Sequence, residues 1–245
     1  LTALLLAFGC SQLAWGPLSD RWGRRPILLL GLTAYVAAAL GCALAQSMES
    51  LIFWRTVQGA AMGAGVMGAR AVVRDLYAPV EGAHAMSRAL TGLGIIACLS
   101  PPLGGLLAGH LGWRATMVAL ACFGGMALLL VLLRFEETLA RPNPQALRPA
   151  HLARTWGQIL RHPTFLAYSA TTTFTYAGLF TYLAASSFTF IQVLDWSPTA
   201  YGLLLSCNAA MYITGTVLCR RRLVRWGLRR SIALAGLLSA TGGTL

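Results

Sequence analysis

Long apolar runs recur along this chain and constrain its fold more than any other feature. Eight runs can be distinguished, each close to the roughly 20 residues that a helix needs to cross a bilayer. They cover residues 1–19, 26–45, about 51–73, 89–109 and 115–133, parts of 163–194 and 196–219, and a last run from 231. Because lipid offers no hydrogen-bond partners to the backbone, such runs predict membrane-spanning helices and an all-α membrane protein.

Composition and charge agree with this prediction. Hydrophobic residues make up 57% of the chain and charged residues 11%, whereas about a quarter of a soluble domain is charged. All nineteen basic residues are arginines, which outnumber the seven acidic residues to give a net charge of +12 and cluster between the apolar runs. Membrane topology explains this clustering, so we expect no nucleic-acid partner. The cysteines and histidines show no metal-ligand spacing, so no metal site is expected.

The connections between the runs alternate in charge. Those at residues 46–50, 110–113 and around 195 carry no arginine, whereas those at 20–25, 70–88, 134–162 and 220–230 are arginine-rich. Short arginine-rich loops are retained in the cytoplasm, so the second group is predicted to face it. The long connection at 134–162 also places Leu152, Trp156 and Ile159 on one helical face, which indicates an amphipathic helix on the membrane surface.

This connection divides the chain into three predicted parts. Residues 1–133 form an N-terminal half-bundle, 134–162 a cytoplasmic linker, and 163–245 the start of a C-terminal half-bundle. A short repeat supports the division, since the pattern at 21–27 recurs at 225–232 with one inserted residue. Both ends of the sequence lie inside apolar runs and no initiating Met is present, so we expect a fragment of a longer protein.

A short basic stretch joins the first two runs and reads Gly16-Pro17-Leu18-Ser19-Asp20-Arg21-Trp22-Gly23-Arg24-Arg25-Pro26. We interpret it as a tight loop at the cytoplasmic surface. Asp20 stands at the C-terminal end of a helix, where the macrodipole disfavours negative charge, so it requires a cation or a helix N-terminus nearby. Arg24 and Arg25 are the nearest candidates in the sequence.

The third run contains an arginine inside a predicted span. Placing Arg55 there costs about 2.5–3.5 kcal/mol if the residue is central, and less near the end of the span. Gln58 and Gly59 share its helical face, which favours a protein cavity, although Arg55 could also extend to the outer surface. Glycines spaced along this run indicate close helix packing.

The fourth run contains Pro101 and Pro102, followed by Gly104 and Gly105. A proline pair removes backbone hydrogen bonds and kinks a helix, and the glycines leave the bend room to move. The pattern predicts a hinge, and a static kink remains the alternative.

Hydroxyl groups are frequent in the sixth run, and the seventh adds an amide. Tyr176, Tyr182 and Asn208 could line a substrate path, although many hydroxyls in such helices bond to their own backbone. No carboxylate lies centrally in any run. A proton-exchanging protein would therefore need one from a helix outside this sequence.

Several of these motifs resemble those of the major facilitator superfamily of transporters. The first basic stretch resembles the loop between the second and third helices of that family, which acts as a conformational latch. The resemblance assigns this role to Gly16, Asp20, Arg21, Gly23, Arg24 and Arg25. Arg55, Gln58 and Gly59 are similar to a fourth-helix signature implicated in coupling, and Pro101, Pro102, Gly104 and Gly105 to a fifth-helix motif of exporters. Arg74-Asp75 and Glu137-Thr138-Leu139 resemble the Bcr/CflA group of bacterial drug-efflux facilitators.

The resemblance implies a fold and a function. The fold would be a major facilitator bundle with about eight of twelve helices present, from about the second to the ninth. The function would be proton-coupled efflux of small amphipathic drugs or metabolites by alternating access, in a monomer of the bacterial inner membrane. The proton gradient would supply energy without a cofactor, and no enzyme activity is expected. An importer of a sugar or small metabolite, or a non-transporting receptor, is the alternative.

Overall fold

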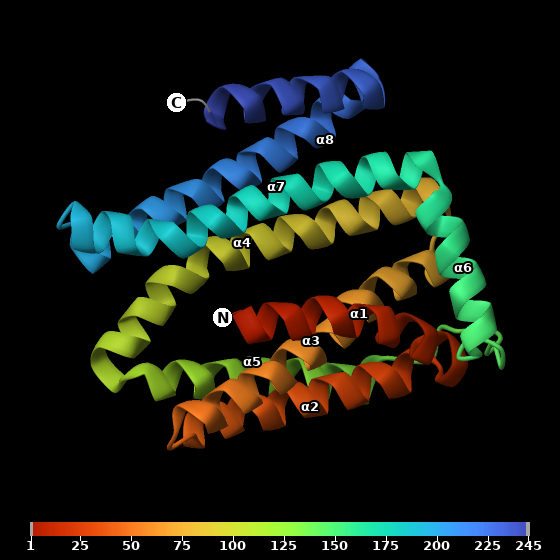
Figure 1. The fold of residues 1–245 in the computed structure, drawn as a ribbon, viewed down its shortest axis with the longest axis horizontal. Helices are drawn as coiled ribbons and strands as arrows, with labels where there is room; N and C mark the ends of the chain where they lie inside the picture. The colour runs from red at the N-terminus through yellow and green to blue at the C-terminus, as the bar shows by residue number, and fades with distance from the viewer. Residues whose placement is uncertain (1, 244–245) are drawn as a thin grey trace.

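The computed structural model describes the backbone of residues 2–243, and the side chains of these residues except 79–80, 198–199, 219–229, 231–232, 239–240 and 243. Its regular elements are all helices (Figure 1): α1 Thr2–Trp22, α2 Arg24–Leu44, α3 Met48–Leu76, α4 Pro79–Leu111, α5 Trp113–Arg134, α6 Pro149–Arg161, α7 Pro163–Ser187, the π-helix η1 Phe188–Val193 and α8 Pro198–Gly243. The predicted all-α architecture is confirmed.

The long helices run back and forth in roughly the same direction, and α6 crosses their ends (Figure 1). The α1–α2 junction, the α3–α4 junction and the segment after α5 all lie at the end where α6 lies. These are the connections that the arginine pattern predicts to be cytoplasmic. Within the described residues, five stretches are long and apolar enough to cross a membrane, in α2, α4, α5, α7 with η1, and α8.

Three of the connections are shorter than the sequence predicts. The basic loop between the first two spans is reduced to Gly23, because α1 continues to Trp22 and α2 begins at Arg24. The connection between α3 and α4 is likewise short, so Arg70, Arg74 and Arg88 belong to helices. The predicted break at residues 220–230 is wrong: α8 stays helical through it, since arginine and leucine are good helix formers and no proline interrupts. The last part of α8 turns back instead (Figure 1).

Small residues bring the first helices close together. A Cβ on Gly59 of α3 would overlap the carbonyl of Leu4 in α1, and the indole of Trp15 in α1 donates to the Ala60 carbonyl at 2.7 Å. Gly31 of α2 meets Ala64 of α3 in the same way. Since lipid provides no hydrophobic drive for helix association, such close backbone approach is the main source of packing energy.

Helix α5 holds both ends of α2. The guanidinium of Arg114, at the start of α5, donates to the carbonyls of Ala43 at 3.1 Å and Ala45 at 2.9 Å, where α2 ends. The carboxylate of Glu137, just after α5, accepts hydrogen bonds from the first amides of α2. The α2 macrodipole favours the positive charge of Arg114 at its C-terminal end and the negative charge of Glu137 at its N-terminal end. Helices α2 and α5 therefore form a unit that is fixed at both membrane surfaces.

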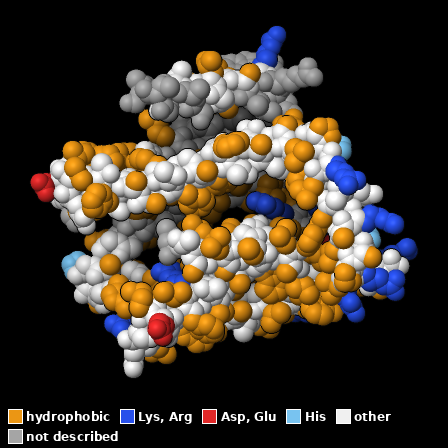
Figure 2. All heavy atoms as spheres, in the orientation of Figure 1, with side chains coloured by type: hydrophobic (Ala, Val, Ile, Leu, Met, Phe, Trp, Pro, Cys, Tyr) orange, Lys and Arg blue, Asp and Glu red, His pale blue; other side chains and the backbone are white. Residues whose placement is uncertain are grey.

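Helix α4 leaves this group and packs against α8, where a Cβ on Gly94 would press on Ile213. Figure 1 shows that α4 changes direction in its yellow-green part, around residue 100. Pro101 and Pro102 lie inside the helix there, and nothing approaches within 4 Å of a Cβ placed on Gly104 or Gly105. The prolines explain the bend through their missing hydrogen bonds. Large apolar side chains cover much of the outer surface (Figure 2), as a lipid-facing bundle requires.

Candidate functional site

The basic stretch forms a compact ionic cluster at the end of the bundle that α6 crosses. Arg24 is only 2% exposed, and its guanidinium donates from Nη1 to Asp20 at 2.7 Å and from Nε to Asp75 at 2.8 Å. Nη1 also contacts Ser19 Oγ at 2.6 Å. We call Ser19, Asp20, Arg24 and Asp75 the latch cluster. It joins the end of α1, the start of α2 and the end of α3 through one side chain.

The expected partners of Asp20 are only partly right. Arg24 binds it, but Arg25 does not: its Nη2 donates to the Leu132 carbonyl at 3.1 Å instead. A second cation comes from Arg74 of α3, whose Nη2 lies 3.9 Å from Asp20 Oδ1. Arg25 follows Arg24 directly on a helix, so its side chain points away from Asp20. Arg21 is exposed and forms no ion pair within the described part of the chain.

Glu137 belongs to the same site, although its motif in the sequence predicted no role there. Its Oε1 accepts from the amides of Arg24 at 2.8 Å and Leu139 at 2.9 Å, and its Oε2 from the amide of Arg25 at 3.0 Å. Burial would raise the pKa of Glu137, but these amide donors outweigh burial and hold its pKa below the ordinary value. Local spacing could not reveal the contact, since Glu137 lies 113 residues from Arg24.

A hollow of about 270 Å³ opens beside the latch cluster. It is lined by Gly16, Ser19, Asp20, Arg24, Met67, Arg70, Ala71 and Arg74. The predicted latch residue Gly16 therefore lies on its wall, and the predicted signature residues Arg74 and Asp75 lie at or beside it. Sequence reasoning placed these residues in separate motifs, and the fold brings them together.

The predicted coupling group lies along α3, away from the latch cluster. Arg55 Nη1 donates to Gln58 Oε1 at 3.0 Å, and Arg55 is half-buried. Gln58 is 1% exposed, and its Nε2 has no partner within the described residues. Gly59 is buried against α1. Arg55 therefore lies half-buried and paired with a buried amide of its own helix.

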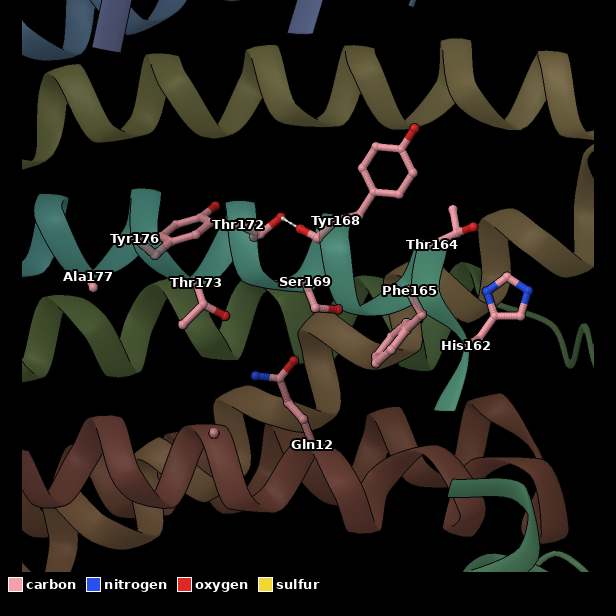
Figure 3. Close-up of a pocket in the computed structure, with 11 residues that line it drawn as sticks. Gln12, His162, Thr164, Phe165, Tyr168, Ser169, Thr172, Thr173, Tyr176 and Ala177 are labelled. Atoms are coloured by element: carbon pink, nitrogen blue, oxygen red, sulfur yellow. Dashed lines mark hydrogen bonds between the residues drawn. The ribbon is translucent and has the colours of Figure 1, made fainter. Parts of the chain in front are cut away.

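A wide cleft of about 960 Å³ separates α1 from α7 (Figure 3). Gln12 points from α1 toward α7, while Phe165, Ser169 and Thr173 point from α7 toward α1. The predicted path residue Tyr176 also lines the cleft. Gln12 was not singled out from the sequence, since a single amide in an apolar run gives no signal of which face it occupies.

Tyr182 and Asn208 do not line this cleft. The Asn208 amide donates to the Tyr182 hydroxyl at 2.9 Å, which ties α7 to α8. Many hydroxyls of α7 bond to their own helix, as expected, including Thr171, Thr172 and Thr175. No group of three His, Cys, Asp or Glu side chains suited to a metal ion occurs within the described residues.

A bundle of this kind, with a charged latch between neighbouring helices, is typical of membrane transporters. The family model of the Major Facilitator Superfamily matches residues 1–245, so the chain belongs to that superfamily. Its named relatives are transporters and resistance proteins rather than enzymes, and its apolar helices make it a multi-pass membrane protein.

Curated relatives carry drug-resistance names. The chain is 26% identical to the bicyclomycin resistance protein homolog of Haemophilus influenzae, over 96% of this chain and 59% of the relative. It is 37% identical to the multidrug resistance protein D of Escherichia coli, over 62% of this chain and 36% of the relative. The resemblance to the Bcr/CflA group is confirmed by these matches. The matches thus cover 59% and 36% of these two relatives, well short of their full length.

A solved structure shares the fold. The human organic anion transporter MFSD10 (TETRAN) superposes with a TM-score of 0.64 at 23% identity, over 88% of this chain and 54% of that one. At this identity the likeness concerns the fold alone. It confirms that the helices are arranged as part of a major facilitator bundle.

Proposed function

We propose that the chain is part of a secondary active transporter that exports small amphipathic drugs or metabolites in exchange for protons. The transporter would alternate between access to either side of the bacterial inner membrane. Arg24 carries this proposal, because one nearly buried guanidinium joins three helices at one membrane surface. An ion-pair cluster of this kind has two discrete arrangements, closed and broken, which is what a two-state transporter needs.

Efflux is supported by the resistance names of the relatives, and the bend in α4 supports a helix that moves. The cleft between α1 and α7 is lined by hydroxyl and amide groups together with aromatic rings, which suits a small amphipathic substrate. The transporter would work as a monomer and need no cofactor, with the proton gradient as its energy source.

Proton exchange needs a titrating group within the membrane. The acidic residues of the chain lie at helix ends or in connections: Asp20, Glu49, Asp75, Glu81, Glu136, Glu137 and Asp195. We propose that the proton carrier is a carboxylate from another helix of the transporter, and that Arg55 tunes its protonation.

Inverted membrane vesicles test the proposal. An imposed proton gradient, acid inside, should drive accumulation of chloramphenicol or a similar amphipathic drug, and a protonophore should abolish it. Accumulation that requires ATP, or proton-driven movement in the opposite direction, would contradict the proposal. Drug accumulation is also compared between Arg55→Lys, which keeps the positive charge, and Arg55→Leu, which removes it.

A further inference from the structure

Helix α2 has no capping group of its own at the cytoplasmic surface. Its N-cap is Gly23, which offers no side chain, and its first turn contains no acidic residue. The first amides of a helix lack intrahelical partners and require an acceptor. In this protein the acceptor is the Glu137 carboxylate, which lies just after the end of α5.

Gly23 and Glu137 fit one another. Gly23 has φ of +101°, which side-chain-bearing residues rarely adopt, and a Cβ at this position would overlap the Glu137 carboxylate. The glycine therefore does two things: it lets the chain turn between α1 and α2 within one residue, and it leaves room for the carboxylate to reach the amides.

The capped residue is also the central residue of the latch cluster. The Arg24 amide binds Glu137, while the Arg24 guanidinium binds Asp20 and Asp75. The backbone of Arg24 is thus held from one side and its side chain from the other. If the first turn of α2 frayed, the guanidinium would lose the position from which it reaches both carboxylates.

Two further hydrogen bonds tie the last turn of α5 and the segment after it to the same turn. The Asn143 amide donates to the Asp20 carbonyl at 2.8 Å, and Arg25 Nη2 donates to the Leu132 carbonyl at 3.1 Å. The segment therefore contacts the chain on both sides of Gly23. It continues into α6 and from there into α7, so it connects the latch cluster to the second half of the molecule.

We propose that Glu137 is a positioning residue of the latch: by capping α2 it holds Arg24 in place to bridge Asp20 and Asp75. Movement of the second half, passed along the segment after α5, would withdraw the carboxylate and loosen the bridge. This last step rests on the proposed alternating-access function, whereas the positioning role itself does not.

Hydrogen exchange tests the positioning role directly. In the protein reconstituted in lipid nanodiscs, Glu137→Gln should speed exchange of the Arg24 and Arg25 amides roughly tenfold, since two charge-assisted hydrogen bonds are weakened. It should also speed exchange at the end of α3, around Asp75, at least about threefold, through the loosened Arg24 bridge. No hydrogen bond or ion pair joins Glu137 to α3 within the described residues, so a purely local cap would not change exchange there.

Glu136 supplies the matched control. It is the neighbouring carboxylate, it is exposed, and it forms no hydrogen bond or ion pair in the described part of the chain. Glu136→Gln removes the same charge and should leave exchange as in the wild type. Acceleration confined to α2, no acceleration, or the same change in both variants would overturn the proposal.

Transport separates this inference from the proposed function. In vesicles, Glu137→Gln should change the maximal rate of drug transport and leave KM as it is, because the latch lies away from the substrate cleft. A shift in KM with an unchanged rate would contradict the coupling of the latch to movement. If the wild type moved no drug, the proposed function would fail, while the exchange data would still decide the role of Glu137.

Discussion

Arg24 differs from the neighbouring arginines in its burial and in the number of carboxylates that it binds. Arg21, Arg24 and Arg25 lie within five residues, yet only Arg24 is buried and bound to two carboxylates. This difference in burial arises from where each arginine lies around the turn at Gly23, with Arg21 on α1 and the other two on α2. Arg24 lies four residues from Asp20 and faces α3, while Arg21 points outward.

The first prediction concerns this burial. Arg24→Leu leaves Asp20 and Asp75 with only the exposed Arg74 nearby, 3.9 Å from Asp20. It should lower the free energy of unfolding by about 1–3 kcal/mol, less than for a fully buried pair because Asp20 is 42% exposed. Arg21→Leu removes an equal charge and should change stability by less than about 0.5 kcal/mol. Thermal unfolding in detergent compares the two. Equal losses of unfolding free energy in the two variants would show that the removed charge, and not its burial, determines the effect on stability.

The second prediction concerns pH. The pKa of Glu137 lies below its ordinary value of 4.5, so its carboxylate cap should be fully effective above that pH. Stability is then lost as pH falls through the lowered pKa, because the unfolded chain binds the proton first. The measurement is the difference between the unfolding midpoints of wild type and Glu137→Gln from pH 7 to 3, which isolates this carboxylate from the other acidic groups. That difference should stay constant down to about pH 5 and shrink below it.

Local residue contacts could be predicted from the sequence, and distant ones could not. The Arg55–Gln58 pair follows from a helical spacing of three residues. Asp20 and Arg24 lie on two helices joined at Gly23, so their pairing was expected from their closeness in the sequence. The Glu137 cap and the Arg74 contact with Asp20 need the tertiary fold, since no pattern within a helix relates those positions.

At the scale of helices, spacing of glycines predicts packing but not which glycine makes the contact. Gly59, Gly63 and Gly68 each face a neighbouring helix, whereas nothing lies within 4 Å of a Cβ on Gly65. The four look alike in the sequence. Only the rotation of α3 between α1 and α2 separates them.

The third prediction uses this difference. Alanine is about 1 kcal/mol more favourable than glycine inside a helix, so Gly65→Ala should raise stability slightly. Gly59→Ala should lower it by about 1–3 kcal/mol, because the added methyl group pushes α1 away at Leu4. Unfolding in detergent measures both. If both variants changed the free energy of unfolding in the same direction, the contact assigned to Gly59 and the open space assigned to Gly65 would be contradicted.

The fourth prediction concerns the α4 bend. Replacing Pro101 and Pro102 together with alanine restores two backbone hydrogen bonds and should straighten α4. Spin labels on the exposed positions Leu90 and Leu106 should then move apart toward the roughly 24 Å of a straight helix. A Pro17→Ala variant, in α1, leaves this distance unchanged as a control. An unaltered distance in the double variant would show that packing, not proline, bends the helix.

Across the whole molecule, charge alternation and run length were enough to predict the order of helices and the surface at which the connections meet. Helix ends were less predictable, because arginines normally read as loop residues are helical here: Arg70 and Arg74 extend α3, and residues 220–230 extend α8. Helical propensity and the absence of proline decided these positions over the charge pattern.

The single-residue joint at His162 has a mechanical consequence. Because α6 ends at Arg161 and α7 begins at Pro163, a single residue joins the two helices, and a movement of one helix is passed directly to the other. In the proposed transport cycle, a tilt of α7 would move α6 along the membrane surface, so the lipid there would resist the motion. A stiffer or more anionic membrane would then slow the proposed cycle without contacting the substrate.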